Sequence, residues 1–599
     1  MSKKHVFLAL LSIMVLASFF RLWDIKSIPP GFYPDEAMYA NNALEAWETT
    51  NFSALGWKIF YPENNGREGL WINIISLPLA ILGNEPWVPR GVAAFFGILT
   101  VLGLYFLAKE LFSSDRVALL ASFFMATSFW HINFSRIGFR AILAPFFLVW
   151  SFYFLWRAFK KAEFFNSLSL PRRRRDVRPR LELKNLLFSP SIIIAASGLL
   201  FGLGFHTYIA YRVAPLLLII PFMLLWKARQ KKLILIFLIF AFLAALPLGI
   251  YFLKNPQDFF GRASQLSIFA GQSPVGDFGL NILKTIGMFF FRGDYNWRHN
   301  LAGAPQLWWP VAILFLFGSI MYCKNCFRGL AKIWRKLRSR VEKSNCLSKA
   351  SFGFFVKRGD YNLPKSERLS ENNFYNEKTF LLAWLIILLI PTIISNEGLP
   401  HALRGIVVIP AIMIFSALGL EEIIVKASLW LTKKMEQYPQ YSAQLKRIRK
   451  EFVALLFFFA VAAVGQTFNQ YFLRWAPNPN VADAFIANYV KIGRYLNTLP
   501  EDIPKYVIIN ADGVDVYGIP MPSQTVMFIT KTYLPKWQSE KNIFYIPMKN
   551  LDSFIGEAKQ KENLYIAMLE NDAILRAALK EKINGLKIDA SSGIITLHK

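Results

Sequence analysis

Two neighbouring stretches near the amino terminus decide the fold class of this chain: residues 6–23, VFLALLSIMVLASFFRLW, and residues 33–40, YPDEAMYA. The first is an apolar run of about the length that a helix needs to cross the ~30 Å hydrocarbon core of a membrane. The second places the carboxylates of Asp35 and Glu36 shortly after that run. Because a charged side chain deep in lipid is costly, we expect the pair at the water-facing mouth of a membrane bundle.

The chain is apolar over most of its length. Of the 599 residues, 54% are hydrophobic and only 18% are charged. Long apolar runs recur as far as residue 472, which excludes a soluble protein and predicts an all-α polytopic membrane bundle. The net charge of +29 does not indicate a nucleic-acid partner, because the Lys and Arg residues gather in loops between the apolar runs.

Eleven of the apolar runs are long enough, or nearly so, to be membrane spans. The expected spans are 6–23, 91–109, 117–133, 141–158, 189–206, 212–227, 232–253, 306–323, 379–395, 403–425 and 451–472. A further apolar segment, 70–83, is shorter and contains Pro78. We expect this segment to lie flat on the outer membrane surface as an interfacial helix.

The distribution of basic residues predicts the orientation. With Lys3 and Lys4 in the cytoplasm and 70–83 on the surface, the strongly basic loops all fall on the cytoplasmic side. Loop 159–188 holds nine Lys and Arg against three acids, and loop 324–378 holds fourteen against five. This is the positive-inside pattern of a multi-pass protein of the cell membrane. The expected outer segments are 24–90, 134–140, 207–211, 254–305, 396–402 and the tail.

The tail, 473–599, alternates short β-like runs with helical stretches, which is typical of a small α/β domain. Strands are expected at 506–509, 526–529, 543–546 and 564–568, and helices at 551–562 and 571–583. The chain is thus expected to comprise a transmembrane domain, 1–472, and an extracytoplasmic domain, 473–599. Cys323, Cys326 and Cys346 complete neither a disulfide framework nor a metal site, and we interpret them as ordinary thiols.

The acidic pair in the first outer loop has two interpretations. Asp35 and Glu36 follow Pro34 at the start of a helix expected over 36–49, and proline and acids at a helix start favour the helix itself. A carboxylate at the mouth of a bundle is equally suited to accept a proton in catalysis. Glu68 adds a third carboxylate in the same loop, and from these residues alone both interpretations stay open.

The other polar groups of the predicted outer side are mostly basic. They are Arg136, Arg140, His206, Tyr208, Arg212, Arg292, Asp294, Trp297, Arg298, His299, His401 and Arg404. A single Arg near a membrane face is usually an interfacial anchor, but several Arg and His clusters on one face indicate a site for a phosphate group. Beside an apolar bundle, these residues suit a lipid that carries a phosphate.

Five stretches in order resemble a known family. They are YPDEAMYA at 33–40, Arg67-Glu68-Gly69, FWHINFSRIGFR at 129–140, RGDYNWRHN at 292–300 and PHALRGIVVIP at 400–410. They resemble the bacterial C-type glycosyltransferases of the protein O-mannosyltransferase and aminoarabinose transferase group. These enzymes were formerly grouped with the dolichyl-phosphate-mannose-protein mannosyltransferases, glycosyltransferase family 39. The resemblance covers roughly residues 6–425 and leaves out the tail.

The resemblance implies an activity and a catalytic residue. In that group the first Asp of an outer-loop Asp-Glu pair is catalytic, and it matches Asp35 here. The donor is a polyprenyl- or dolichyl-phosphate monosaccharide, the transfer inverts the anomeric centre, and basic outer residues hold the phosphate. The resemblance leaves protein, glycolipid and glycan open as acceptors.

The resemblance also raises two questions about this chain. Many relatives carry a second Asp just ahead of a Pro before the fourth span, but here Ala144 precedes Pro145, so Glu68 or Glu36 is expected to supply the second acid. No cofactor is required, although some relatives bind a divalent metal. Glu68, His206 and His401 are the residues that would ligate such an ion here.

Two functions of other classes compete with the enzyme. A multi-span transporter or flippase for lipid-linked sugars should place ionisable residues near the bilayer midplane in broken helices. The mid-span regions of this chain are almost free of charge, and the polar groups gather at one mouth, which favours the enzyme. A membrane scaffold whose tail binds a partner would leave Asp35 and the arginines without a role.

Overall fold

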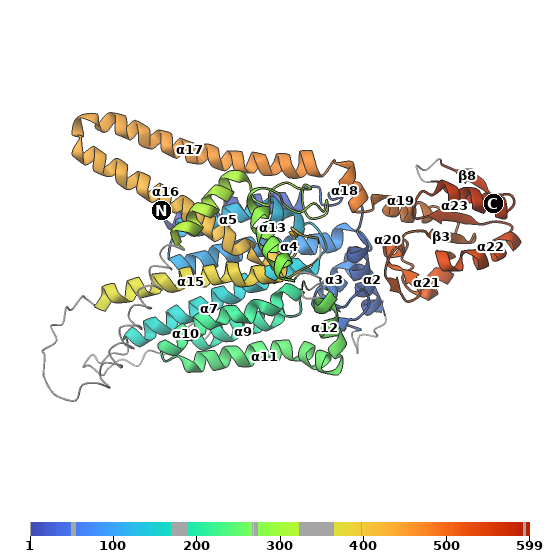
Figure 1. Ribbon diagram of the computed structural model, residues 1–599, viewed down its shortest axis with the longest axis horizontal. Helices are drawn as coiled ribbons and strands as arrows, with labels where there is room; N and C mark the ends of the chain where they lie inside the picture. Colours follow the sequence, from blue (N-terminus) through green and yellow to red (C-terminus); the bar gives the residue numbers. More distant parts are fainter. Residues whose placement is uncertain are drawn as a thin grey trace.

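A bundle of long helices and a small sheet make up the computed structural model, which describes residues 2–48, 56–168, 189–265, 268, 274–322, 365–396, 398–590 and 595–599. The bundle occupies most of its length, and the sheet lies at one end with the carboxyl terminus (Figure 1). The three Cys residues, Glu397 and the greater part of the basic loops 159–188 and 324–378 lie outside the described residues.

Each predicted span overlaps a helix or two consecutive helices. These helices are α1 (Lys3–Leu22), α4 (Trp87–Phe112), α5 (Asp115–Ala126), α6 (Phe129–Phe134), α7 (Leu143–Leu168), α9 (Pro190–Gly204), η2 (Ile209–Leu218), α10 (Ile219–Lys227), α11 (Lys231–Lys254), Trp309–Tyr322, α15 (Lys365–Ile393), α16 (Ile409–Gln437) and α17 (Ser442–Phe468). The run 117–133 is not one continuous helix, because α5 ends at Ala126 and a new helix, capped by the Ser128 side chain, begins at Phe129.

Seven helices in the described part of the chain are long and apolar enough to cross a membrane. The all-α membrane bundle with a small sheet at its carboxyl end is thus confirmed, whereas the number of eleven spans stays a prediction. Helices α16 and α17 form a hairpin that projects from the bundle at the end away from the sheet (Figure 1).

The segment between α1 and α4 folds into three short elements between the bundle and the sheet (Figure 1). They are α2 (Pro34–Glu48), the hairpin β1–β2 (Phe60–Tyr61 and Arg67–Glu68) and α3 (Leu70–Leu82). Helix α3 buries Trp71, Ile72 and Ile75 but leaves Ile81 70% exposed. A short helix with one buried face agrees with the expected interfacial segment, because a lipid surface would cover the other face.

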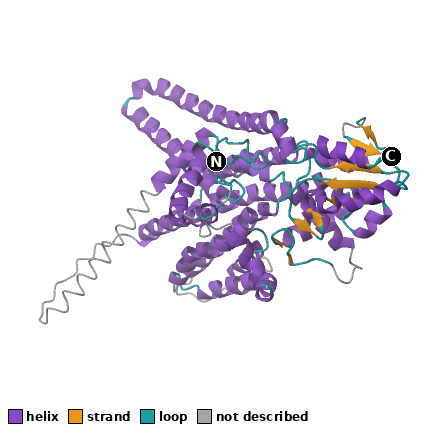
Figure 2. Cartoon of the chain, turned by 45° about the vertical axis from the view of Figure 1, so that its right-hand side comes forward, coloured by secondary structure: helices purple, strands orange, loops and turns teal. Residues whose placement is uncertain are grey.

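The tail is a three-layer α/β unit (Figure 2). Its five-stranded sheet has the order β6 (Ile543–Pro547), β3 (Lys505–Ile509), β7 (Tyr565–Met568), β9 (Thr596–His598) and β8 (Lys587–Asp589). Strands β6, β3 and β7 are parallel. Helices α22 (Leu551–Gln560) and α23 (Ala573–Lys582) pack on one face of the sheet, and α19 (Ala487–Leu496) and α20 (Gln524–Thr530) pack on the other.

One predicted strand of the tail is wrong. Residues 526–529 belong to helix α20, and all residues of that helix are buried. A short apolar run has no periodicity that separates a buried strand from a buried helix. This run is apolar on all sides because α20 packs against the sheet on one side and against α2 on the other.

Helix α20 attaches the tail to the acidic loop. The Asn41 side chain of α2 donates to the Gln524 carbonyl at 3.0 Å and to its side-chain oxygen at 2.9 Å. The Thr525 hydroxyl donates to the Phe32 carbonyl at 2.8 Å. A Cβ atom at Gly31, which has a φ of +75°, would lie 2.3 Å from the Phe485 carbonyl oxygen. The chain entering α2 therefore lies directly against the tail.

Candidate active site

A cavity of about 170 Å³ opens beside the start of α2. It collects seven of the predicted site residues, from five separate segments, and we call it the arginine cavity. These residues are Asp35, Glu68, Arg140, Tyr208, Arg212, His401 and Arg404. The sequence separates them by more than three hundred positions, and only the folded bundle brings them to one wall.

Asp35 is positioned by the first turn of α2 and by a left-handed turn. Residues Asn64, Asn65 and Gly66 have φ values of +51°, +63° and +79°, a conformation that Asn and Gly adopt most readily. This turn brings the Asn64 amide to Asp35, where its nitrogen donates to Oδ1 at 2.9 Å. One carboxylate oxygen of Asp35 is thereby oriented, and the half-buried side chain faces the cavity.

Glu68 lies between two arginines. Its Oε2 is 3.2 Å from Nε of Arg140, and its Oε1 is 3.8 Å from Nη2 of Arg212. The first pair is close but not aligned as a hydrogen bond. Within the described residues, Nε and Nη1 of Arg140 have no hydrogen-bond partner. Arg212 is held differently, by the Phe259 carbonyl at 2.9 Å and by the Phe259 ring at 4.5 Å.

Glu36, the neighbour of Asp35, points away from both the cavity and the solvent. It is fully buried and forms an ion pair with Arg90, 3.1 Å between Oε1 and Nε. The Gly138 amide donates to the same oxygen at 2.8 Å. Arg90 also donates to the carbonyls of Pro29 and Gly31. This geometry gives Glu36 the structural role that the sequence left open for the acidic pair.

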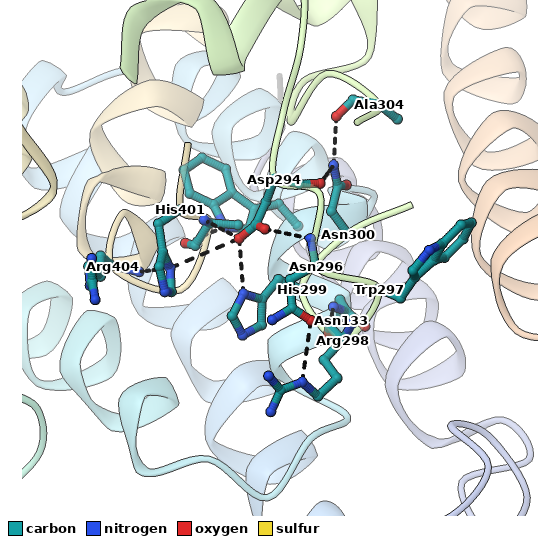
Figure 3. Close-up of polar contacts among 12 residues, drawn as sticks. Asn133, Asp294, Asn296, Trp297, Arg298, His299, Asn300, Ala304, His401 and Arg404 are labelled. Carbon is teal, nitrogen blue, oxygen red and sulfur yellow. Dashed lines mark hydrogen bonds and ion pairs between the residues drawn. The ribbon is translucent and has the colours of Figure 1, made fainter. Parts of the chain in front are cut away.

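Asp294 joins two of the outer loops (Figure 3). Its Oδ2 accepts from Nδ1 of His299 at 2.9 Å and from the Ala402 amide at 2.8 Å, while Oδ1 accepts from the Asn296 amide at 2.8 Å. The loop that carries His401 and Arg404 is therefore tied to the loop of residues 292–304. Arg404, which donates to the Ser395 hydroxyl, takes its position from this connection.

Burial and neighbouring charges shift the pKa values of all three titratable groups in this cluster. Burial lowers the pKa of His299 and, more strongly, that of His401, where the charges of His299 and Arg404 act in the same direction. Burial alone would raise the pKa of Asp294, but the hydrogen bond from His299 and the nearby imidazoles outweigh it, so the pKa of this carboxyl is lowered.

One group of described residues could hold a metal ion, and it shares only His401 with the predicted set of Glu68, His206 and His401. Ligand atoms of Asp294, His299 and His401 lie within 4.8 Å of one another, and this is the one such group in the described parts of the chain. His206 is instead bonded through Nε2 to the Ala244 carbonyl at 2.9 Å. Glu68 faces two guanidinium groups, which oppose a divalent cation there.

Several predicted residues lie outside the arginine cavity. Arg136 is buried and donates to the carbonyls of Phe20, Trp23 and Ile28, so it anchors the end of α1 to the loop after α6. Arg292 is exposed. The Arg298 guanidinium stacks 3.7 Å from the centre of the ring of Tyr33, two residues before Asp35. The Trp297 carbonyl accepts from the Trp475 indole at 2.8 Å.

The structure adds residues that the sequence reading missed. Asn64 orients Asp35, and the Asn-Asn-Gly run was a detectable signal for a left-handed turn. Tyr39 lines the cavity four residues after Asp35, a spacing that places both on one face of α2. Arg90, the partner of Glu36, carried no signal beyond its place at the start of an apolar run.

Comparisons with known proteins give a partial family match and several similar folds. The family model described as "Dolichyl-phosphate-mannose-protein mannosyltransferase" matches residues 70–169. None of the curated proteins matches the sequence. The crystal structure of ArnT from Cupriavidus metallidurans in the apo state aligns with a TM-score of 0.51 at 12% identity, covering 99% of this chain and 98% of that one.

Two further solved structures have lower scores. ArnT from Cupriavidus metallidurans bound to undecaprenyl phosphate aligns with a TM-score of 0.48 at 12% identity, covering 100% of this chain and 98% of the other. The apo oligosaccharyltransferase from Archaeoglobus fulgidus aligns with a TM-score of 0.44 at 12% identity, covering 94% and 70%.

The chain therefore shares its overall fold with ArnT from Cupriavidus metallidurans. The resemblance that the five sequence motifs indicated is confirmed for the fold. Independently of the fold, the family model matches residues 70–169 of the sequence.

Proposed function

We propose that this protein is a membrane glycosyltransferase that moves a monosaccharide from a polyprenyl phosphate to an acceptor at the outer face of the cell membrane. The observation that carries the proposal is the arginine cavity, where one oriented carboxylate, Asp35, shares a wall with Arg140, Arg212 and Arg404. A lipid-phosphate sugar needs both kinds of group. The multi-pass bundle supplies the apolar surface for the polyprenyl chain.

The arginines are the groups proposed to hold the phosphate. Arg140 has two nitrogen atoms without a hydrogen bond to the described residues, and guanidinium groups bind phosphate through paired hydrogen bonds. Glu68 lies against this guanidinium group and keeps the cation in place before the donor arrives. A phosphate monoester or diester would then replace part of the interaction that Glu68 provides.

Asp35 is proposed to act as the base. The acceptor oxygen attacks the anomeric carbon, the bond between that carbon and the phosphate oxygen breaks, and the acceptor proton passes to the Asp35 carboxylate. Attack opposite the leaving phosphate inverts the configuration of the anomeric carbon. The polyprenyl phosphate leaves with the negative charge that Arg140 and its neighbours stabilise. The sugar and the acceptor are open within this proposal, and mannose is the sugar that the family name suggests.

The first test uses the full chain in detergent with a panel of labelled polyprenyl-phosphate sugars. Release of labelled sugar, as free sugar or as a glycoside, is expected for at least one donor. Asp35→Asn keeps the shape of the side chain and can still accept from Asn64, so folding and donor binding should be retained. The rate should fall by about 10²–10⁴, the usual contribution of a general base.

The matched control is Asp258→Asn, because Asp258 lines the same cavity but accepts from the Tyr251 hydroxyl at 2.7 Å. This variant should retain most of the wild-type rate. If Asp35→Asn turns over like wild type at equal protein levels, Asp35 is not the base and only stabilises the start of α2. If wild type cleaves none of the donors in the panel, the proposed function is wrong.

A further inference from the structure

We propose that Glu68 sets the charge selectivity of the arginine cavity, so that the cavity accepts a phosphate with one negative charge and disfavours a phosphate with two. This inference rests on the proposed glycosyl transfer and concerns the release of its lipid product. It gives Glu68 a specificity role that is distinct from the role of a second acid.

The donor and the lipid product of the proposed reaction differ by one charge at the phosphate. The donor is a phosphodiester and carries a single negative charge. When the bond between the anomeric carbon and the phosphate oxygen breaks, the electron pair stays on that oxygen and the acceptor proton passes to Asp35. The polyprenyl phosphate that leaves is a monoester, whose second pKa of about 6 gives it nearly two negative charges at neutral pH. A cavity with an excess of positive charge would therefore hold the product more tightly than the donor.

The charged side chains on the wall of the arginine cavity balance one another. Three arginines face three carboxylates, and these residues are Arg140, Arg212, Arg404, Asp35, Glu68 and Asp258. The histidine on the same wall, His401, has a pKa well below its usual value, mainly because it is buried. Loss of the charge of Glu68 would leave the wall with a net positive charge.

Glu68 is the carboxylate that lies against the arginines. Its side chain is 3% exposed, with Oε2 at 3.2 Å from Nε of Arg140 and Oε1 at 3.8 Å from Nη2 of Arg212. Within the described residues, Oε2 of Glu68 has no hydrogen-bond partner. Asp35 and Asp258 each accept a hydrogen bond from a neutral side chain instead. The charge of Glu68 is therefore opposed by the cavity arginines alone and acts directly on an anion that approaches them.

The backbone of the β1–β2 hairpin keeps Glu68 in this position. Glu68 pairs with Phe60 across the two strands, and the Gly69 amide donates to the Ile59 carbonyl at 2.8 Å. The strands approach so closely that a Cβ atom at Gly69 would overlap the Lys58 carbonyl. Glu68 therefore stays on the wall whether the cavity is empty or filled.

An anion that binds Arg140 comes within range of the Glu68 charge. Nε and Nη1 of Arg140 have no hydrogen-bond partner among the described residues, and a phosphate oxygen would bond them at about 2.8 Å. The phosphate then lies within roughly 8 Å of the Glu68 carboxylate, no farther than the Debye length at physiological ionic strength. Because the repulsion is proportional to the charge of the ligand, Glu68 disfavours the monoester more than the diester.

The experiment measures the binding of two short lipids to the full chain in detergent and needs no turnover. Farnesyl phosphate is a monoester, and methyl farnesyl phosphate is a diester with the same hydrocarbon chain. The dissociation constant of each radiolabelled lipid is measured at pH 7.5 and at pH 5. Wild type should bind the monoester no more tightly than the diester at pH 7.5, because the wall has no excess of positive charge.

Glu68→Gln removes the charge and nearly keeps the shape of the side chain. At pH 7.5 it should bind the monoester about tenfold more tightly than wild type does, but the diester only about threefold, because the free energy scales with the ligand charge. At pH 5 the monoester keeps mainly one charge, so the gains for the two lipids should become equal.

Two further variants serve as controls. Glu68→Asp keeps the charge on a shorter side chain, so the ratio of the two dissociation constants should stay within about twofold of wild type. Glu85→Gln removes an exposed carboxylate that lies 3.7 Å from Arg494 and lines neither cavity wall nor arginine, and it should change neither constant. The unfolding midpoint of each variant shows that the compared proteins are folded.

Three results would overturn the inference. Wild type that binds the monoester about tenfold more tightly than the diester at pH 7.5, or that binds neither lipid saturably, would do so without any variant. Equal gains for the two lipids in Glu68→Gln at pH 7.5 would show that Glu68 does not discriminate by charge. None of these measurements depends on glycosyl transfer, whose failure would appear separately as absence of donor cleavage by wild type.

Discussion

The adjacent acids Asp35 and Glu36 should respond to substitution in opposite ways. Glu36→Gln removes a charge that is fully buried against Arg90 at 3.1 Å. Removing one partner of a buried ion pair costs about 3–5 kcal/mol because the other charge stays buried. Arg90 retains the Pro29 carbonyl at 2.6 Å and the Gly31 carbonyl at 2.9 Å. We therefore expect a loss near the lower limit, about 3 kcal/mol of unfolding free energy.

The assay has two readouts on the same detergent-solubilised protein. The first is the apparent midpoint of thermal unfolding, which should fall by several degrees in Glu36→Gln. The second is donor cleavage per folded molecule, which should stay within about threefold of wild type. Glu36 lines neither the arginine cavity nor the cavity between the acidic loop and the tail. Glu422→Gln is the control, since its pair with Lys426 is exposed and such pairs contribute about 0–1 kcal/mol.

A contrary outcome would be a wild-type unfolding midpoint together with a drop in turnover of about 10²-fold or more. That result would make Glu36 the second acid of the reaction and would show that Arg90 does not depend on it. The double variant Glu36→Gln, Arg90→Gln gives a further check, because removing both charges should restore part of the lost stability.

Two further predictions concern the cations around the site. Arg140→Gln and Arg404→Gln should each weaken binding of a polyprenyl-phosphate sugar relative to the same lipid without phosphate. Lys at either position should restore binding only partly, because the planar guanidinium fork is lost. If both Gln variants bind the donor like wild type, the phosphate is held elsewhere. The lowered pKa values of His299 and His401, set mainly by burial and opposed by Asp294, predict stability that is fully present above pH 6.5 and is lost as the pH falls toward the folded-state values. The unfolding midpoint should therefore drop between pH 7.5 and pH 5, and it should drop less after His299→Gln and His401→Gln but not after exposed His5→Gln; an unchanged slope in the double variant would contradict the assignment.

The class of fold was predictable from the sequence because membrane spans leave a strong signal. An apolar run must be about as long as the hydrocarbon core is thick, so α1, α4 and α11 lie within a few residues of their predicted ranges, whereas α7 continues ten residues past its predicted end at 158. The break between α5 and α6 escaped prediction, since both sides of Thr127 are apolar and the helix change there depends on the Ser128 cap. Residues 526–529 of helix α20 were predicted as a strand because a short apolar run has no periodicity that separates a buried strand from a buried helix.

The candidate site was predictable in its residue types but not in its arrangement. Seven predicted residues do line one cavity, because polar groups at the mouths of neighbouring helices have few other places to lie. The family resemblance singled out Asp35, but the residues themselves did not separate it from Glu36, since both are acids in the first turn of one helix. The structure separates them: Glu36 is bonded to Arg90 and to the Gly138 amide, whereas Asp35 is oriented by Asn64.

The contact between α2 and α20 can form only late in the synthesis of the chain. Residues Asn41 and Gln524 bond across nearly the whole length of the chain, so the ribosome finishes the bundle long before it makes the tail that packs on α2. If the tail crosses the membrane last, as the predicted orientation requires, a newly inserted bundle has Asp35 open to water on that side. The start of α2 would then be covered only when the final segment has been translocated and has folded. A chain released early would reach the membrane with its arginines in place but with the start of α2 uncovered.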